Sequence, residues 1–215
     1  YDERALTKKA IEYFGITNKY LINTVSNIIN PAFKTRLFRF LMKNILFRKF
    51  AINNPEYLEL MAHSIRQVDR EKSAVFYYFT RAGAYYQLAC ETCHPSKVFC
   101  ADELFMMLAA SIAWRDKGNI TPPTQFFKTV PLPNILIFVE CPAEICLQRQ
   151  EKRGRISVEA EWVTDKITAQ ENWIQICENV VRAADEQGIN IIKTRSTQSI
   201  PEVVEEINNR INYVR

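Results

Sequence analysis

Two acidic residues, Asp102 and Glu103, directly follow a short apolar run, Lys97–Ala101 (KVFCA), that we predict to be a β-strand. In an open parallel sheet, ligands bind at the carboxyl ends of the strands. A carboxylate at that place can hold Mg²⁺ or accept a proton from an attacking hydroxyl group. Asp102 and Glu103 are therefore candidate catalytic residues, and Asp102 is a candidate metal ligand. An ordinary helix start is the alternative, because acids are also favourable in a first helical turn.

Basic residues gather where a predicted helix ends, and a single glycine, Gly154, lets the chain turn between them: Arg149, Lys152, Arg153 and Arg155. Guanidinium groups bind phosphate oxygens through two hydrogen bonds and stabilise the charge of a phosphoryl group in transfer. The three arginines are therefore candidate catalytic residues. The alternative is a solvated helix end, where basic side chains complement the helix dipole.

The elements that would position these residues follow from the apolar patterning. From residue 97 onward, short apolar runs alternate with longer amphipathic segments. Strands are predicted at Lys97–Ala101, Ile135–Glu140 and Ile189–Lys193, and helices at Glu103–Arg115, Ala143–Lys152, Glu159–Gln187 and Ile200–Tyr213. This alternation predicts βαβ crossovers and a parallel sheet. Near-continuous apolar strands indicate helices on both faces of that sheet.

Glycine and proline support these boundaries. Gly188 lies where a helix C-cap should precede a strand, and Pro201 lies just inside the last helix, with Ser199 before it as the cap. The stretch 117–134 contains four prolines and is predicted to be a loop. Residues before 97 show helical periodicity throughout.

Length and composition indicate one globular domain of 215 residues, with 47% hydrophobic and 24% charged residues. Residues 1–96 would form a helical region and 97–215 a parallel-sheet region with a lid near 149–160. The net charge of +4 is too mild to indicate a nucleic-acid partner. No apolar run reaches the ~18 residues of a membrane-spanning helix. The six cysteines lack a secretory context, which predicts reduced thiols and a cytoplasmic protein.

Two further motifs allow several interpretations. Cys90, Cys93 and His94 match the pattern of haem attachment, and with Cys100 they could ligate zinc, although ordinary thiols at a helix end are the preferred interpretation. Segment 31–50 carries six basic residues and no acid, with apolar residues at helical spacing. Such a helix can lie on an anionic membrane surface, but we favour a core-facing helix whose polar side guides an anionic substrate.

Three segments, in their order and spacing, resemble the thymidylate kinase-like members of the P-loop nucleoside and nucleotide kinases. They are Lys97–Phe105 (KVFCADELF), Pro133–Arg155 (PNILIFVECPAEICLQRQEKRGR) and Asn190–Ile207 (NIIKTRSTQSIPEVVEEI), so the resemblance covers about residues 97–215. It implies an α/β fold with a three-layer parallel sheet. It also implies transfer of the γ-phosphoryl group of Mg-ATP to a small acceptor, namely a nucleoside, a nucleotide or a sugar-type metabolite.

The resemblance assigns roles to individual residues. Asp102 and Glu103 would serve the metal and the acceptor hydroxyl, and Arg149, Arg153 and Arg155 would hold phosphates as the lid closes and excludes water. Beside the adenine of ATP would lie Arg195, Ser196 and Thr197. A homodimer, in which a second copy of the chain is the partner, is a further possibility.

One departure from the family is the phosphate-binding loop. No G-x-x-x-x-G-K-[ST] occurs among the five scattered glycines. In these folds the loop follows a strand that lies between the strands predicted at 97–101 and 135–140. We therefore expect the complete protein to begin with roughly 20–40 more residues that supply this strand and loop. Without them, the alternative function is a catalytically degenerate kinase-like module that binds a nucleotide or a partner protein.

Overall fold

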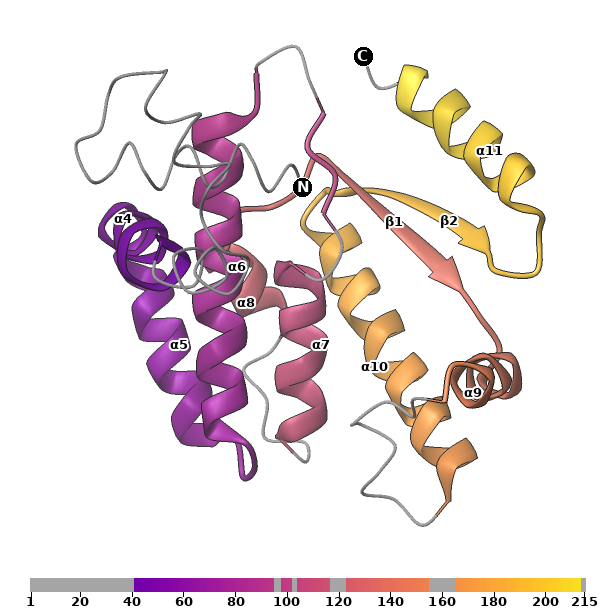
Figure 1. Cartoon of the computed structure of the whole chain (residues 1–215), viewed down its shortest axis with the longest axis horizontal. Helices are drawn as coiled ribbons and strands as arrows, with labels where there is room; N and C mark the ends of the chain where they lie inside the picture. The colour runs from indigo at the N-terminus through magenta and orange to yellow at the C-terminus, as the bar shows by residue number, and fades with distance from the viewer. Residues whose placement is uncertain (1–40, 95–97, 102–103, 117–122, 155–164, 214–215) are drawn as a thin grey trace, which may run out of the picture. The chain divides into compact units, whose positions relative to one another are not determined.

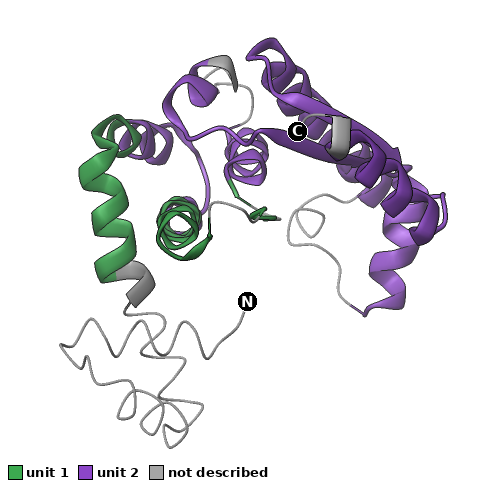
Figure 2. Ribbon diagram, turned by 90° about the horizontal axis from the view of Figure 1, so that it is seen from above, with its two compact units in different colours: residues 1–59, 76–104 green, residues 60–75, 105–215 purple. Residues whose placement is uncertain are grey.

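A computed structural model describes residues 41–94, 98–101, 104–116, 123–154 and 165–213 (Figure 1). Within them the protein is mostly helical and contains a two-stranded parallel sheet. The chain divides into two compact units (Figure 2): unit 1 takes residues 1–59 and 76–104, and unit 2 takes residues 60–75 and 105–215. Helices α5 (Pro55–Gln67) and α6 (Lys72–Thr92) contribute residues to both units.

Unit 1 is built from helices around an aromatic core. A π-helical segment, η1 (Leu41–Leu46), leads into α4 (Phe47–Asn53), and α5 and α6 follow. The rings of Phe50 and Tyr57 meet edge to face at 4.8 Å, and those of Tyr57 and Phe79 at 5.2 Å. The Tyr57 hydroxyl donates to the Phe79 carbonyl oxygen over 2.9 Å, as a buried hydroxyl requires. Burial raises the pKa of Tyr57 well above its ordinary value.

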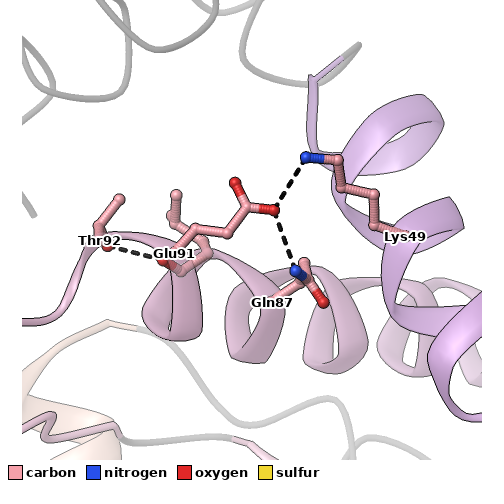
Figure 3. Close-up of polar contacts among 5 residues, drawn as sticks. Lys49, Gln87, Glu91 and Thr92 are labelled. Atoms are coloured by element: carbon pink, nitrogen blue, oxygen red, sulfur yellow. Dashed lines mark hydrogen bonds and ion pairs between the residues drawn. The ribbon is translucent and has the colours of Figure 1, made fainter.

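A polar contact joins α4 to the end of α6 at the surface of unit 1 (Figure 3). Lys49 Nζ lies 3.2 Å from Glu91 Oε1, and Gln87 Nε2 donates to the same oxygen over 3.0 Å. One residue further along α6, the Thr92 hydroxyl donates to the Leu88 carbonyl oxygen. Lys49 belongs to the basic segment 31–50. Its positive charge is therefore one charge of that segment that pairs with an acidic residue of the protein. Residues 31–40 of that segment lie outside the described residues.

Unit 2 is organised around the long helix α10 (Lys166–Glu186). It packs against α7 (Phe105–Arg115), α8 (Pro123–Thr129) and α9 (Ala143–Lys152). Small buried residues on α10, including Ala169 and Ala184, allow this close approach. The rings of Trp114 and Trp173 meet edge to face at 5.9 Å and join α7 to α10.

The sheet of unit 2 consists of β1 (Ile135–Glu140) and β2 (Asn190–Arg195), which pair in parallel. Ile135 lies opposite Asn190, and Glu140 lies opposite Arg195. Because α9 and α10 connect the two strands, this part of the chain is the predicted βαβ crossover. The carboxyl ends of both strands therefore lie side by side at one edge of unit 2, where α11 (Ile200–Tyr213) also begins.

Several predicted elements are confirmed. β1, α9 and α11 have the predicted bounds. Gly188 ends α10 with a φ of +79°, its N–H donates to the Asp185 carbonyl, and the Ile189 N–H donates to the Ala184 carbonyl. This pair of bonds is the Schellman arrangement, in which glycine is favoured because it adopts positive φ at little cost.

Other predictions are wrong in the described residues. The predicted strand 97–101 is absent, since residues 98–101 adopt no regular structure and Val98 is 59% exposed. The stretch predicted as a loop contains the helix α8. This helix begins at Pro123, and proline is tolerated at the first position of a helix. Of the predicted three-layer parallel sheet, the described residues contain two strands, β1 and β2.

Element bounds differ in three further places. α10 begins at Lys166, because the Asp165 side chain accepts a hydrogen bond from the Ile167 N–H and so caps the helix there. β2 spans 190–195 rather than 189–193. α7 begins at Phe105, and the acids 102 and 103 that were expected to precede or open it lie outside the described residues. Among the helices described, none is both long and apolar enough to cross a membrane.

Candidate functional site

The carboxyl end of β2 lies beside that of β1 and leads into a short turn, Ser196–Ser199, that we name the β2–α11 turn. The Ser196 N–H donates to the Glu140 carbonyl over 2.9 Å and extends the strand pairing by one bond. Gln198 then fixes the turn, because its Oε1 accepts from the Arg195 N–H over 3.0 Å and from the Thr194 hydroxyl over 3.1 Å. A side chain that satisfies its own backbone in this way makes a short turn well defined.

Arg149, near the end of α9, reaches this turn. Its Nη2 donates to the Ser196 carbonyl oxygen over 2.9 Å, and its Nη1 lies 3.9 Å from the Cys141 sulfur. One guanidinium group therefore contacts both chain segments that leave the two strands. The predicted residues Arg149, Arg195, Ser196 and Thr197 are thus brought together at the strand ends.

The other predicted site residues are not part of this group as described. Arg153 caps the C-terminus of α9 and is exposed, and Gly154 follows it with a φ of +62°, which allows the predicted turn. Asp102, Glu103 and Arg155 lie outside the described residues.

A cavity of about 660 Å³ opens beside the strand ends. It is lined by the end of β1, the start of α9, the first half of α10, and Arg195 and Thr197. Its apolar lining includes Phe138 and Trp173. Its charged lining is mainly acidic. It contains one basic residue, Arg195, and four carboxylates, those of Glu140, Glu144, Glu171 and Glu178. This lining favours a cation or a cation-bridged anion over a bare polyphosphate.

Three thiols also line the cavity, those of Cys141, Cys146 and Cys177. Burial raises the pKa of the Cys146 thiol to about 12, and its hydrogen bond with Cys141 and the charge of Cys141 act in the same direction. The guanidinium group of Arg149 opposes this rise. At neutral pH the Cys146 thiol is therefore protonated.

Ser196 contributes one more polar atom. Its Oγ is buried and makes no hydrogen bond with any residue that the structure describes. An unpaired buried hydroxyl is unfavourable by about 1–3 kcal/mol. This group can therefore gain a hydrogen bond from a ligand that reaches the β2–α11 turn.

No three His, Cys, Asp or Glu side chains among the described residues lie close enough to hold a metal ion directly. The zinc site considered for Cys90, Cys93, His94 and Cys100 is therefore not formed, and none of the six cysteines is in a disulfide.

Sequence reasoning missed Gln198, Trp173 and the cysteine pair. Gln198 carried a usable signal, because a polar side chain in a short segment between a strand and a helix often caps the local backbone. Trp173 and the cysteines carried none, since a residue that faces a cavity has the same helical spacing as one that faces the core.

Comparison with known protein families, with curated proteins and with solved structures finds no match to this chain.

Proposed function

We propose that this protein binds Mg-ATP at the carboxyl ends of β1 and β2 and transfers its γ-phosphoryl group to a small acceptor of the nucleoside, nucleotide or sugar type. The observation that carries the proposal is the hydrogen bond from Arg149 to the Ser196 carbonyl. It unites the arginine expected to hold phosphates with the turn expected to hold the base. Ligands of open parallel sheets bind at this edge.

Each part of the site has a role in this proposal. Arg195 and Thr197 line the cavity beside the turn and would contact the base and ribose. Arg149 and the exposed Arg153 lie one helical turn apart on α9 and would face the phosphates together with Arg155. The acidic cavity lining would attract the Mg²⁺ ion that accompanies ATP. Asp102 and Glu103 remain the proposed groups for the metal and the acceptor hydroxyl.

The three-layer parallel sheet also belongs to this proposal. β1 pairs with β2 along one edge, and in the part of the chain that is described its other edge pairs with no strand. Ile137 and Val139 of β1 are 40% and 51% exposed. Further parallel strands at this edge would satisfy the backbone groups of β1, and helices packed on the same face would cover these apolar side chains.

Calorimetric titration with Mg-ATP tests the binding step. Because a hydrogen bond from a charged donor contributes about 1.5–3 kcal/mol, Arg149→Ala is expected to weaken binding by ~10–100-fold. Arg182→Ala removes an exposed arginine of α10 outside the cavity and serves as the matched control. Equal affinities of the two variants, or no binding by the unchanged protein, would refute the proposed site.

A second candidate function is nucleotide or partner binding without turnover. It is favoured by the absence of a glycine-rich phosphate loop from the 215 residues and by the lack of a direct metal site in the described part. Incubation with Mg-ATP and a broad panel of hydroxyl and phosphate acceptors separates the two functions. Transfer that is lost in Asp102→Asn supports the kinase, whereas tight binding with no transfer to any acceptor supports the binding module.

A further inference from the structure

Cys141 and Cys146 form a pair at the N-terminus of α9. Cys141 directly follows β1, Pro142 is the N-cap of α9, and Cys146 lies in its first turn. The Cys146 N–H donates to the Pro142 carbonyl over 3.0 Å, so the helix brings residue 146 back over residue 141. Its sulfur lies 3.9 Å from the Cys141 carbonyl oxygen, and the two thiols are hydrogen-bonded.

The two thiols have different surroundings. Cys141 faces the guanidinium group of Arg149, whose Nη1 lies 3.9 Å from its sulfur. A positive charge beside the Cys141 sulfur attracts anionic reagents to it. Cys146 is protonated at neutral pH, because its pKa is raised to about 12. Both are half-buried and line the cavity, so a small reagent can reach them.

We propose that Cys141 and Cys146 are a modification site for low-molecular-weight disulfides, at which Cys141 reacts first and Cys146 then closes an intramolecular disulfide. The inference does not depend on the proposed kinase activity. It rests on the contact between the two thiols, on the position of Arg149, and on the shared cavity.

The chemistry balances in two exchange steps. The Cys141 thiolate attacks one sulfur of the reagent RSSR, the S–S bond breaks, and one RS⁻ leaves and takes up a proton. Cys146 then loses its proton to solvent and attacks the Cys141 sulfur, and the second RS⁻ leaves. The protein loses two electrons and two protons, and RSSR becomes two RSH.

The disulfide would also act on the β2–α11 turn. Arg149 contacts the Cys141 sulfur and the Ser196 carbonyl with the same guanidinium group. A bond from Cys141 to Cys146 changes the position and the hydrogen-bonding capacity of that sulfur. We therefore expect faster amide exchange over residues 196–199 in the oxidised protein than in the reduced protein.

Mass spectrometry of the full chain after incubation with glutathione disulfide measures the site directly. Both cysteines fall in one tryptic peptide, residues 129–149, because Lys128 and Arg149 flank them. We expect this peptide to become about 2 Da lighter as the disulfide forms. Cys177→Ser, which removes the third cavity thiol, should leave both product and rate unchanged. The exposed Cys90 and Cys100 should acquire only glutathionyl groups.

Two variants check the order of events. Cys146→Ser should stop at a glutathionyl group on Cys141, whereas Cys141→Ser should leave Cys146 unmodified at least ~10-fold longer, as its thiol stays protonated. Equal glutathionylation of Cys146 and Cys141 in these variants would overturn the assigned order. A disulfide to Cys177, or only mixed disulfides in the unchanged protein, would overturn the pair itself.

Discussion

At the scale of single residues, Arg149 and Arg115 use the same guanidinium group in two ways. Arg149 is exposed and donates to a carbonyl and a sulfur at the strand ends, where a ligand can compete for it. Arg115 is only 4% exposed, and its Nε and Nη2 both lie 2.9 Å from Glu71 Oε2. Its Nη1 donates to the Ser111 carbonyl over 3.0 Å. Arg149 is thus placed for recognition, whereas Arg115 supports the fold.

Replacement of Glu71 by glutamine should destabilise the protein, because it removes the negative charge that the buried guanidinium group of Arg115 contacts. We expect the free energy of unfolding to fall by about 1–3 kcal/mol. Urea denaturation monitored by circular dichroism measures this change. Glu71 also has a φ of +46°, and glutamine keeps the same backbone strain, so the change isolates the charge.

A surface ion pair provides the matched control. Arg210 lies 3.2 Å from Glu206 at i,i+4 spacing on α11, and both side chains are well solvated. Glu206→Gln should change the free energy of unfolding by less than about 0.5 kcal/mol. Equal effects of the two substitutions would contradict the importance that we assign to the burial of Arg115.

At the scale of elements, polar residues set where the helices begin. Asp165 caps α10, and hydrogen bonds from Thr168 and the Ile167 N–H lower its pKa. At the start of α11, the Ser199 hydroxyl and N–H both donate to Glu202 Oε2, over 2.8 and 2.9 Å. These contacts hold the helix ends in the turns that surround the cavity. Local sequence thereby positions a site that is assembled from distant segments.

The capping contact of α11 should make stability depend on pH. The hydrogen bonds from Ser199 lower the pKa of Glu202 in the folded protein. A carboxyl group of this kind stabilises the fold fully above its unfolded pKa of about 4.3, and that contribution is lost as pH falls through the lower folded value. The difference in unfolding free energy between wild type and Glu202→Gln should therefore shrink below about pH 4, as urea titrations at each pH can show.

Glu205→Gln is the control for this titration, because Glu205 is an exposed residue of the same helix outside the capping contact. Its difference from wild type should vary with pH much less. A Glu202→Gln difference that stays constant down to about pH 3 would contradict the role assigned to the cap.

Helix packing in unit 1 depends on a glycine. A Cβ atom at Gly83 of α6 would lie 2.5 Å from Phe50 Cδ1, closer than real contacts permit. Gly83→Ala should therefore cost about 1–3 kcal/mol of stability, although alanine is the better helix former by about 1 kcal/mol. A Phe50→Leu change should recover part of that loss in the double variant, and thermal unfolding of all four proteins gives the coupling. Strictly additive effects would show that the two residues do not meet.

The sequence predicts those elements best whose ends carry glycine, proline or a capping residue. β1, α9 and α11 are bounded by such residues and were predicted with their observed limits. The run KVFCA has no comparable boundary, and a five-residue apolar run does not distinguish a strand from other structure. At the site, the resemblance placed Arg149 and Ser196 in separate parts of one nucleotide site, and the structure brings the two into contact. Contacts such as that between Cys141 and Cys146 depend on side-chain direction, which no periodicity encodes.

At the scale of the whole molecule, all described residues of the candidate site belong to unit 2. Unit 1 has its own aromatic core of Phe50, Tyr57 and Phe79, each fully buried. A bound ligand slows the hydrogen exchange of certain amides, namely those that exchange only through an opening of the structure that releases the ligand. The division into units therefore predicts which part of the protein a bound nucleotide protects from hydrogen exchange.

Hydrogen exchange with and without Mg-ATP measures this distribution. At a ligand concentration of about 100 Kd, linkage raises protection by about 2.7 kcal/mol for amides whose opening releases the ligand. We expect such gains in β1, α9 and β2, and little change in α4 around Phe50, because the site draws no described residue from unit 1. Equal gains in both units would show instead that they open together as one cooperative structure, and no gain anywhere would remove the nucleotide site itself.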